Sequence, residues 1–555
     1  MGSTLHIGRF WLLAAACITL AVLAPVLTLT AHALQGSTGH WQHLLDYVLP
    51  HAMRNTLLLL LGVGTVTGLL GVGSAWLMTA YSFPTRRVLN WALLLPLAVP
   101  TYIVAFAYQD ILHPIGPVQG VIRDLLGYTS PRQFRLPDVR SLGGAILLLG
   151  LVLYPYVYLS TRAMFATQSA SLLEAGRILG ATRRTVFFRV ALPMARPAIA
   201  VGLSLALLET LNDIGASEFL GVQTLTVSIY TTWVTRSDLA GAAQIALSML
   251  VLVVALIMLE RYGRRRQGYS QNQRSRTVQP QKLTGPTALV AICLGWLPVV
   301  LGFVAPALYL LAESYKYLHQ TGAVSQQLLA SAWSTLYIAL VTTGVTLAMA
   351  LVVAWASRSA RSSGRQRWQQ VFKLASLGYA IPGTVLALGL LLPFVWFDSL
   401  LESIVALFVE RAPQLLLMGT TTALVIAYCI RFLAIGVGSL EAGLARIPPS
   451  VEQAARLLGE TPGGTLRRVH LPLLRPALGA AALLVFVDTM KELPATLLLR
   501  PMNFETLATW LYAEAARGTY EEGAIAALAI VVAGLLPVIL LAKAQFSPQT
   551  RRLSG

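Results

Sequence analysis

The chain has 555 residues, of which 56% are hydrophobic and only 12% charged, and its mean hydropathy is +0.68. This composition excludes a soluble multidomain protein, because apolar runs of roughly 20 residues recur throughout and are long enough to cross a bilayer as helices. The formal net charge of +18 does not indicate nucleic-acid binding, since the arginines gather in alternate loops, as they do on the cytosolic side of membrane proteins.

Twelve membrane spans are predicted, which makes the chain an all-α polytopic membrane protein. With the N-terminus in the cytosol, nearly every arginine-rich loop faces the cytosol, and so do both termini. One long loop on the opposite side, 112–141, also carries arginines, but long loops obey the charge rule weakly. The predicted spans are roughly 10–33, 53–80, 88–111, 142–165, 196–220, 239–260, 286–312, 328–357, 371–397, 415–440, 475–499 and 522–543.

The first span has a second interpretation. Arg9, an apolar stretch and the small residues around His32 resemble a secretory signal peptide with a cleavage site after Ala33. The apolar stretch is longer than a usual signal core, and the second half of the chain begins with its own matching span. An uncleaved helix is therefore the preferred prediction.

The two halves of the chain are copies of each other. Asn55-Thr56 corresponds to Ser334-Thr335 with an offset of about 279 residues, and Val99-Pro100 corresponds to Ile381-Pro382 with a small slip. Six spans in each half give a parallel repeat, with any transport pathway at the repeat interface. The predicted organisation is a first transmembrane helix with its external loop (1–50), a first transmembrane core (51–260), a basic cytosolic linker (261–285), a seventh transmembrane helix with its loop (286–329), a second transmembrane core (330–543) and a cytosolic tail (544–555).

A polar, arginine-rich loop occurs once in each half. The first copy reads E-A-G-R-I-L-G from Glu174 and the second reads Q-A-A-R-L-L-G from Gln453. Each predicts a short helix, a turn at a glycine, a second short helix and a break at a proline. A single copy could be an ordinary interfacial connector, but two copies with matching spacing indicate a docking surface.

This loop resembles the EAA loop of ABC importer permeases, a resemblance that covers nearly the whole chain. It implies a type I permease fold in which each loop forms a coupling helix that inserts into a cytosolic ABC ATPase, two copies of which would serve the two loops. Gln453 replaces the glutamate, with Glu452 one residue early, so the two docking contacts are expected to be unequal. The residues to which the resemblance assigns coupling are Glu174, Ala175, Gly180, Pro193, Gln453, Ala454, Gly459 and Pro472.

The chain itself is not expected to be an enzyme. The dipeptide Gly-Lys, which a phosphate-binding Walker A loop requires, does not occur in it. The resemblance therefore assigns ATP and Mg to the partner subunit and leaves this chain without a cofactor of its own.

Acidic residues follow each copy of the loop, in segments where lipid would not tolerate them without a function or a partner. The nearby Gly215 and Pro494 predict broken helices of the type that build transport sites. A structural ion pair of Lys491 with Asp488 or Glu492 is an equally weighted alternative to a pathway role. The candidate pathway residues are Glu209, Asp213, Asp488, Lys491 and Glu492.

The stretch K-E-L-P-A-T-L-L-L-R-P from Lys491 resembles ferric-iron permeases fused as a single twelve-span chain. This resemblance implies a bacterial inner-membrane location, a periplasmic iron-binding protein, and Fe(III) that passes through without a permanent metal site. Permeases for thiamine, phosphonate or polyamines share the pattern and stay open as alternatives. A secondary transporter driven by an ion gradient and a non-transporting scaffold are less favoured, because neither needs the coupling loops.

Overall fold

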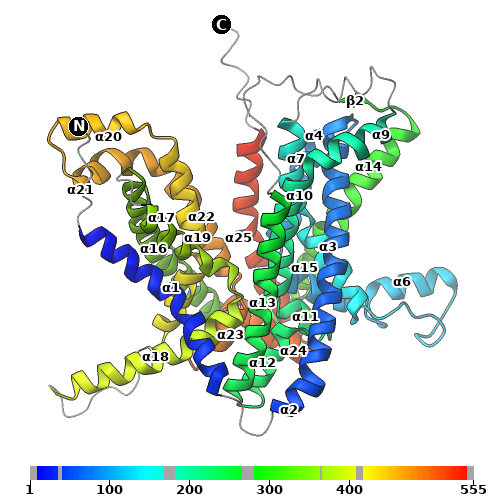
Figure 1. The fold of residues 1–555 in the computed structure, drawn as a ribbon. Helices are drawn as coiled ribbons and strands as arrows, with labels where there is room; N and C mark the ends of the chain where they lie inside the picture. Colours follow the sequence, from blue (N-terminus) through cyan, green and yellow to red (C-terminus); the bar gives the residue numbers. More distant parts are fainter. Residues whose placement is uncertain are drawn as a thin grey trace. The chain divides into compact units, whose positions relative to one another are not determined.

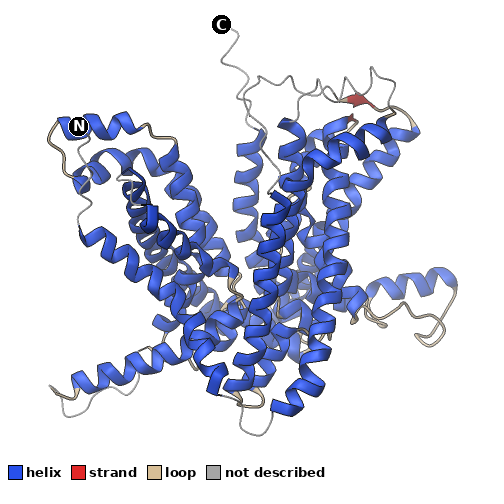
Figure 2. Cartoon of the chain, viewed as in Figure 1, coloured by secondary structure: helices blue, strands red, loops and turns tan. Residues whose placement is uncertain are grey.

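The computed structural model describes residues 9–35, 41–167, 182–264, 280–362, 366–407 and 417–546. These residues are almost entirely helical (Figure 2), and the strands among them are one short parallel pair, β1 (Tyr81–Ser82) with β2 (Gln281–Lys282). Within these ranges, eleven helices are long and apolar enough to cross a membrane, or up to twelve if one bent pair counts as a single span. The prediction of an all-α polytopic membrane protein is confirmed.

The third predicted span is not one straight helix. Its first part, Arg86–Ala98, and its second part, Thr101–Ile111, are bent by 92°. The bend falls at Val99-Pro100, where proline removes a backbone donor and its ring disfavours helical geometry in the preceding residue. The second half has a corresponding helix break, where a 3-10 turn (η5, Ala375–Ala380) ends before Ile381-Pro382 and the next helix starts at Gly383.

The helices pack into two compact units that differ in composition from the two sequence halves. Unit 1 contains the described residues of Met1–Leu44, Ile229–Leu247 and Val324–Trp510. Unit 2 contains those of Leu45–Ser228, Ser248–Ala323 and Leu511–Gly555. The first helix of the chain therefore packs among second-half helices, while the first helices of the second half pack among first-half helices.

Unit 2 is built around α3 (Leu49–Ala80), α7 (Leu142–Thr167) and α10 (Leu192–Asn212), labelled in Figure 1. Gly71 of α3 and Gly202 of α10 both lie against Val157 of α7, where an added Cβ would come within 2.6 Å of Val157 atoms. The remaining helices of unit 2 are α4 (Arg86–Ala92), η2 (Leu95–Ala98), α5 (Thr101–Ile111), α6 (Pro117–Leu126), α9 (Arg183–Val186), η3 (Phe187–Ala191), α11 (Gly215–Phe219), α14 (Pro286–Val299), η4 (Val300–Val304), α15 (Ala305–Thr321) and α25 (Tyr520–Phe546). The short α2 (Trp41–His43) and η1 (Leu44–Val48), with α12 (Leu225–Val234), α13 (Leu239–Arg264) and α24 (Leu507–Arg517), lie where the chain passes between units.

Unit 1 has the corresponding core of α16 (Gln326–Ser362), α19 (Thr421–Ala445) and α22 (Leu471–Met490). The N-terminal helix α1 (Arg9–Gln35) packs on α18 (Gly383–Val405). Gly389 makes this approach possible, because a Cβ there would lie 2.3 Å from the carbonyl oxygen of Pro25. The other helices of unit 1 are α17 (Gln366–Leu374), α20 (Pro449–Leu457), α21 (Pro462–Thr465), η6 (Leu466–His470) and α23 (Pro494–Leu499).

Candidate coupling and translocation sites

The second copy of the arginine-rich loop forms the predicted helix, turn and second helix. Helix α20 runs from Pro449 to Leu457, and Gly459, two residues beyond its end, has φ +84°. Glycine adopts this left-handed conformation without the steric cost that a Cβ would bring, so it ends the helix. An added Cβ would meet no atom within 4 Å, so the requirement for glycine comes from the backbone angle rather than from crowding.

One face of α20 is open to solvent. Gln453 and Ala454 are exposed, and Leu457 and Leu458 at the end of the helix are 89% and 85% exposed. Two adjacent leucines with this exposure form an apolar tip beside a polar glutamine. Such a tip is typical of a surface that another protein covers.

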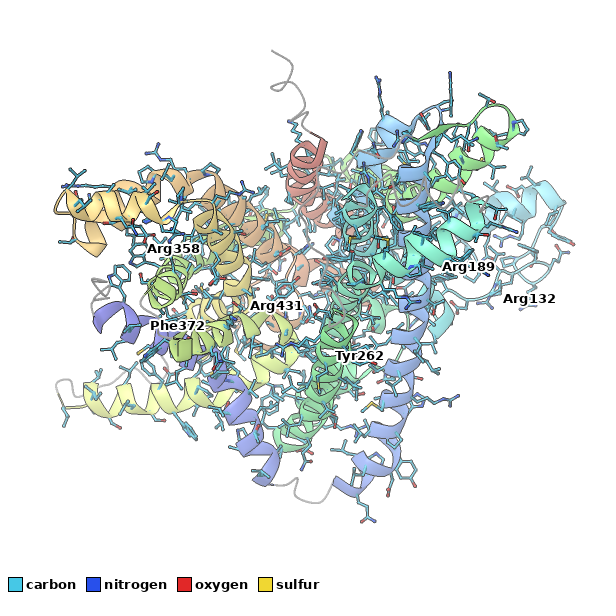
Figure 3. The ribbon with its side chains drawn as sticks, turned by 45° about the horizontal axis from the view of Figure 1, so that its top comes forward. Arg132, Arg189, Tyr262, Arg358, Phe372 and Arg431 are labelled. Atoms are coloured by element: carbon cyan, nitrogen blue, oxygen red, sulfur yellow. The ribbon has the colours of Figure 1, made fainter. Side chains whose placement is uncertain are left out.

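The opposite face of α20 is anchored through Glu452. Arg358 of α16 donates its Nε to Glu452 Oε1 at 2.5 Å, and His470 Nε2 lies 3.2 Å from the same oxygen (Figure 3). Arg358 also donates to the backbone carbonyls of Leu444 and Ile447. The guanidinium of Arg358 therefore holds the end of α19 and the start of α20 against α16.

The same contacts set the charge on Glu452. Burial raises the pKa of this carboxyl, but the hydrogen bonds and charges of His470 and Arg358 outweigh burial and bring the pKa below its ordinary value. His470 is fully buried, with its ring 5.0 Å from that of Trp355. Glu452 is thus held as an internal carboxylate, and it does not take the exposed place of the glutamate that Gln453 replaces.

The first copy of the loop is described only in part. Glu174, Ala175 and Gly180 lie outside the described residues. The positions that would match Arg358 and His470 are Thr79 and Ala191, which cannot form the same charged network.

The prediction that Pro193 and Pro472 break the chain is wrong. Both lie in the first turn of long helices, α10 and α22, which continue directly from the π-helical turns η3 and η6. Proline has no N–H to donate and its ring displaces the carbonyl of the preceding turn. A single wider π turn accommodates both effects, so the helix continues instead of ending.

The predicted helix breaks after the two loops are confirmed. Helix α10 ends at Asn212 and α11 starts at Gly215, while α22 ends at Met490 and α23 starts at Pro494. Two of the candidate acids lie in these breaks. Asp213 accepts the N–H of Ala216 at 2.9 Å, and Glu492 accepts the N–H of Ala495 at 3.3 Å. Each carboxylate thereby satisfies a free donor in the first turn of the next short helix.

The second interaction partner of each carboxylate differs between the units. In unit 2 the hydroxyl of Thr101 donates to Asp213 Oδ2 at 3.3 Å. In unit 1 the partner is Arg431, which is in the interior of α19 and labelled in Figure 3. Its Nε lies 3.5 Å from Glu492 Oε1. Asp213 and Glu492 are only 7% and 5% exposed. Their partners lie in their own units, and the expectation that they line a passage stays a prediction.

The other acids are more open. Asp488 and Lys491 form an ion pair of 2.8 Å, with side chains 23% and 31% exposed. This confirms the predicted pairing of Lys491 with Asp488, whereas Glu492 pairs with Arg431. Glu209 on α10 is half-buried.

Two sets of residues were missed at the sequence level. Arg431 could have been found as a lone arginine inside an apolar span, which lipid rarely tolerates without a partner. Glu218 accepts a hydrogen bond from the hydroxyl of Tyr512, whose ring stacks on Phe219 at 5.6 Å, and nothing in the sequence pattern links these distant positions. Among the described residues no group of three or more His, Cys, Asp and Glu side chains could hold a metal ion.

Comparison with known proteins agrees with this architecture. Residues 67–268 match the family described as binding-protein-dependent transport system inner membrane component. The ModB protein of Escherichia coli (strain K12), a molybdenum transport system permease, is 31% identical over 209 residues, which is 35% of this chain and 88% of that protein. The chain belongs to the binding-protein-dependent transport permeases.

Two further relatives differ in how much of the permease they cover. The Fe(3+)-transport system permease protein FbpB 2 of Haemophilus influenzae is 26% identical over 555 residues, which is 97% of this chain and 99% of that protein. The PhnU protein of Salmonella choleraesuis, whose name assigns it provisionally to 2-aminoethylphosphonate transport, is 30% identical over 46% of this chain and 93% of its own length. The permease is thus a multi-pass inner-membrane subunit of an ABC importer, and such subunits work with an ATPase and a binding protein.

Proposed function

We propose that this permease imports ferric iron delivered by a periplasmic iron-binding protein, with two copies of a cytosolic ABC ATPase supplying the energy. The observation that carries the proposal is the alignment over 97% of the chain with a permease named for Fe(3+) transport, whereas the phosphonate and molybdenum relatives cover less than half of it. In this proposal both termini are cytosolic, ATP and Mg are used by the partner, and the chain itself holds no cofactor.

The coupling role falls to the two loops. Exposed Gln453 and Ala454, with the apolar tip of Leu457 and Leu458, would enter a cleft of one ATPase copy. Gly459 would set the turn behind the helix, and Pro472 the start of α22. In the first half, Glu174, Ala175, Gly180 and Pro193 would do the same for the other copy. The internal use of Glu452 supports unequal docking, since only the first copy would then present a free carboxylate.

The pathway role falls to the open charged residues. Lys491, Asp488 and Glu209 are partly exposed in the spans that follow the coupling loops, and charged groups open to hydrocarbon would be strongly disfavoured. We therefore place them beside water in the translocation path. Carboxylate oxygens suit a hard cation such as Fe(III), which would pass without a permanent site. Asp213 and Glu492 would keep the broken helices in shape around that path.

The test uses the permease reconstituted in proteoliposomes with its ATPase. Candidate binding proteins are added outside, loaded with Fe(III), 2-aminoethylphosphonate, thiamine or a polyamine. The proposal expects ATP hydrolysis and uptake to be stimulated by the iron-loaded protein and by no other. Stimulation by the phosphonate-loaded protein would replace iron with the second candidate, which the PhnU relative favours.

The energy source needs its own control. Uptake should stop when ATP is omitted and continue when an uncoupler removes the ion gradient. Uptake that persists without ATP and collapses with the uncoupler would identify a secondary transporter instead. An ATPase that binds the permease but responds to none of the loaded proteins would indicate a scaffold.

A further inference from the structure

The loop between α5 and α7 folds around two buried polar side chains of α6. Within it, Gln119 and Arg123 of α6 are 1% and 8% exposed. Gln119 donates to the carbonyl of Leu112 at 2.8 Å and accepts the N–H of Leu136 at 3.1 Å. Arg123 donates to the carbonyl of Pro114 at 2.7 Å. These bonds fold residues 112–136 into a small ordered structure around its own polar centre.

The outer face of α6 is apolar, with the exposed Asp124 at its edge. Val121, Leu125 and Leu126 are 59%, 81% and 56% exposed, and Ile115 just before the helix is 78% exposed. A surface helix in water has the reverse arrangement, with its apolar stripe turned inward. The inverted arrangement indicates that the medium outside α6 is apolar.

The same loop also exposes positively charged side chains. Arg132, Arg135 and Arg140 are exposed, and Arg132 is labelled in Figure 3. In the same loop the rings of Tyr128 and Phe134 stack on each other, with centroids 6.3 Å apart. Exposed arginines beside aromatic rings and an apolar helix face match the layered chemistry of a membrane surface, where phosphates lie above acyl chains.

The position of the loop fits this medium. Its ends join α5, which stops at Ile111, to α7, which starts at Leu142, and both belong to candidate membrane spans. The loop is therefore tethered at both ends to the same face of the bilayer. In Figure 1, α6 runs across the direction of α3, a helix of the same unit, rather than along it.

We propose that residues 112–141 form a lipid-binding element, in which the outer face of α6 lies in the acyl boundary of the leaflet and Arg132 and Arg135 bind phosphate headgroups. This explains why the loop carries four arginines against two aspartates on the side of the membrane where positive charge is normally sparse. The inference does not depend on which substrate the permease carries. The leaflet is the periplasmic one if both termini are cytosolic.

The experiment places a fluorescent probe on the two sides of α6. A background without the native Cys17, Cys293 and Cys429 receives either Leu125→Cys or the neighbouring Asp124→Cys, labelled with bimane. Consecutive helix positions are rotated by about 100°, so the second variant is the matched control. The full chain is placed in nanodiscs of phosphatidylcholine with phosphatidylglycerol, and quenching by spin-labelled lipid is compared with quenching by aqueous iodide.

The proposal expects the probe at Leu125 to be quenched at least about twice as strongly by spin-labelled lipid as the probe at Asp124, and less by iodide. Spin-labelled phosphatidylglycerol should quench better than spin-labelled phosphatidylcholine. Each arginine near an anionic surface adds to the attraction. Arg132→Gln and Arg135→Gln should therefore each lower the preference for phosphatidylglycerol over phosphatidylcholine about five-fold.

Equal iodide quenching at both positions, without lipid quenching, would overturn the proposal by placing α6 in water. Iodide protection that appears only when a loaded binding protein is added would also overturn it, because the face would then belong to a protein partner. Lipid quenching without any preference for phosphatidylglycerol would overturn the role of the arginines. Val121→Cys gives the same readout should the Leu125 variant fail to fold.

Discussion

The two helix breaks that follow the coupling loops have the same backbone design and different chemistry. In each, a carboxylate accepts an N–H from the first turn of the next short helix: Asp213 from Ala216 and Glu492 from Ala495. In unit 2 the second partner is the hydroxyl of Thr101. In unit 1 it is the guanidinium of Arg431.

Two sequence differences between the halves account for the different partners of the two acids. The residue after Val99-Pro100 is Thr101, and the residue after Ile381-Pro382 is Gly383. A Cβ at Gly383 would lie 2.6 Å from Arg431 Nη1 and 2.7 Å from Glu492 Oε1, so glycine leaves the space that the arginine fills. Position 152, which matches Arg431 in the first half, is a buried valine. The repeated acid thus serves the helix break in both halves, with a guanidinium beside it in unit 1 and a neutral hydroxyl in unit 2.

The largest effect is expected from removing the cation. Arg431→Val leaves Glu492 buried without a counter-charge, which typically costs about 3–5 kcal/mol. Adding Gly383→Thr should restore part of the loss, because it supplies the hydroxyl that serves Asp213 in the other unit. The measurement is the unfolding temperature of the detergent-solubilised full chain, determined from the loss of its folded peak in size-exclusion chromatography after heating.

The control for this pair lies on the same helix. Arg446 caps the end of α19 and is exposed, so Arg446→Leu should change stability by less than about 0.5 kcal/mol. Gly383→Thr alone should be destabilising, since the arginine occupies its space. Wild-type stability for Arg431→Val would refute the importance of the ion pair.

A smaller effect is expected at the anchor of α20, which the first half cannot copy with Thr79 and Ala191. Arg358→Leu removes hydrogen bonds to Glu452 and to two backbone carbonyls, and bonds to charged groups contribute about 1.5–3 kcal/mol. We expect the ATPase to bind less tightly and its stimulation by the loaded binding protein to fall more than the amount of folded permease. Arg467→Leu, an exposed change nearby, should leave both unaltered.

The anchor also predicts a pH dependence. The folded-state pKa of Glu452 lies below its ordinary value of 4.5, so its contribution to stability is fully present above that pH and is lost as the pH falls through the lowered pKa. Glu452→Gln should therefore reduce the difference in unfolding temperature between pH 6 and pH 4. An unchanged pH profile in this variant would show that Glu452 carries no net stabilisation.

Some features of the fold could be predicted from the sequence and others could not. The turn at Gly459 and the breaks at Asp213 and Glu492 were predictable, because glycine, proline and their repeated spacing act locally on the backbone. The partner of Glu492 was not, since Arg431 lies on another helix and only packing brings the two together. The packing of α1 on α18 through Gly389 was likewise hidden, because apolar periodicity shows that a face is buried but not what covers it. The continuous helices at Pro193 and Pro472 needed π turns, which local propensity does not reveal.

A still smaller effect on stability is expected at Asp213, which accepts an N–H at the start of α11 in unit 2. Asp213→Ala removes the acceptor for the N–H of Ala216 and should cost about 1 kcal/mol, whereas Asp213→Asn keeps an oxygen in place and should cost less. If Asp213 only shapes the break, uptake per folded molecule should be near normal in the asparagine variant. A strong loss of uptake with normal stability would instead assign it to the substrate path.

The smallest effect on stability, and the sharpest on function, is expected for the partly exposed acids. A fully buried Lys491 left without a partner would cost about 3–5 kcal/mol, but Lys491 and Asp488 are 31% and 23% exposed. Exposed pairs contribute only about 0–1 kcal/mol. Asp488→Asn and Glu209→Gln should therefore give normal amounts of folded permease.

Uptake separates the two roles of these acids. If they border the iron path, uptake per folded molecule should fall strongly in both variants, while binding of the ATPase stays normal. Lys491→Met combined with Asp488→Asn should not recover uptake. The double variant removes the unpaired lysine, but it does not restore the carboxylate that the cation path needs. Recovery in the double variant, or normal uptake in both single variants, would show that Asp488 is merely the ionic partner of Lys491. A carboxylate kept open in a membrane span would then have a structural role in unit 1, as Asp213 has in unit 2.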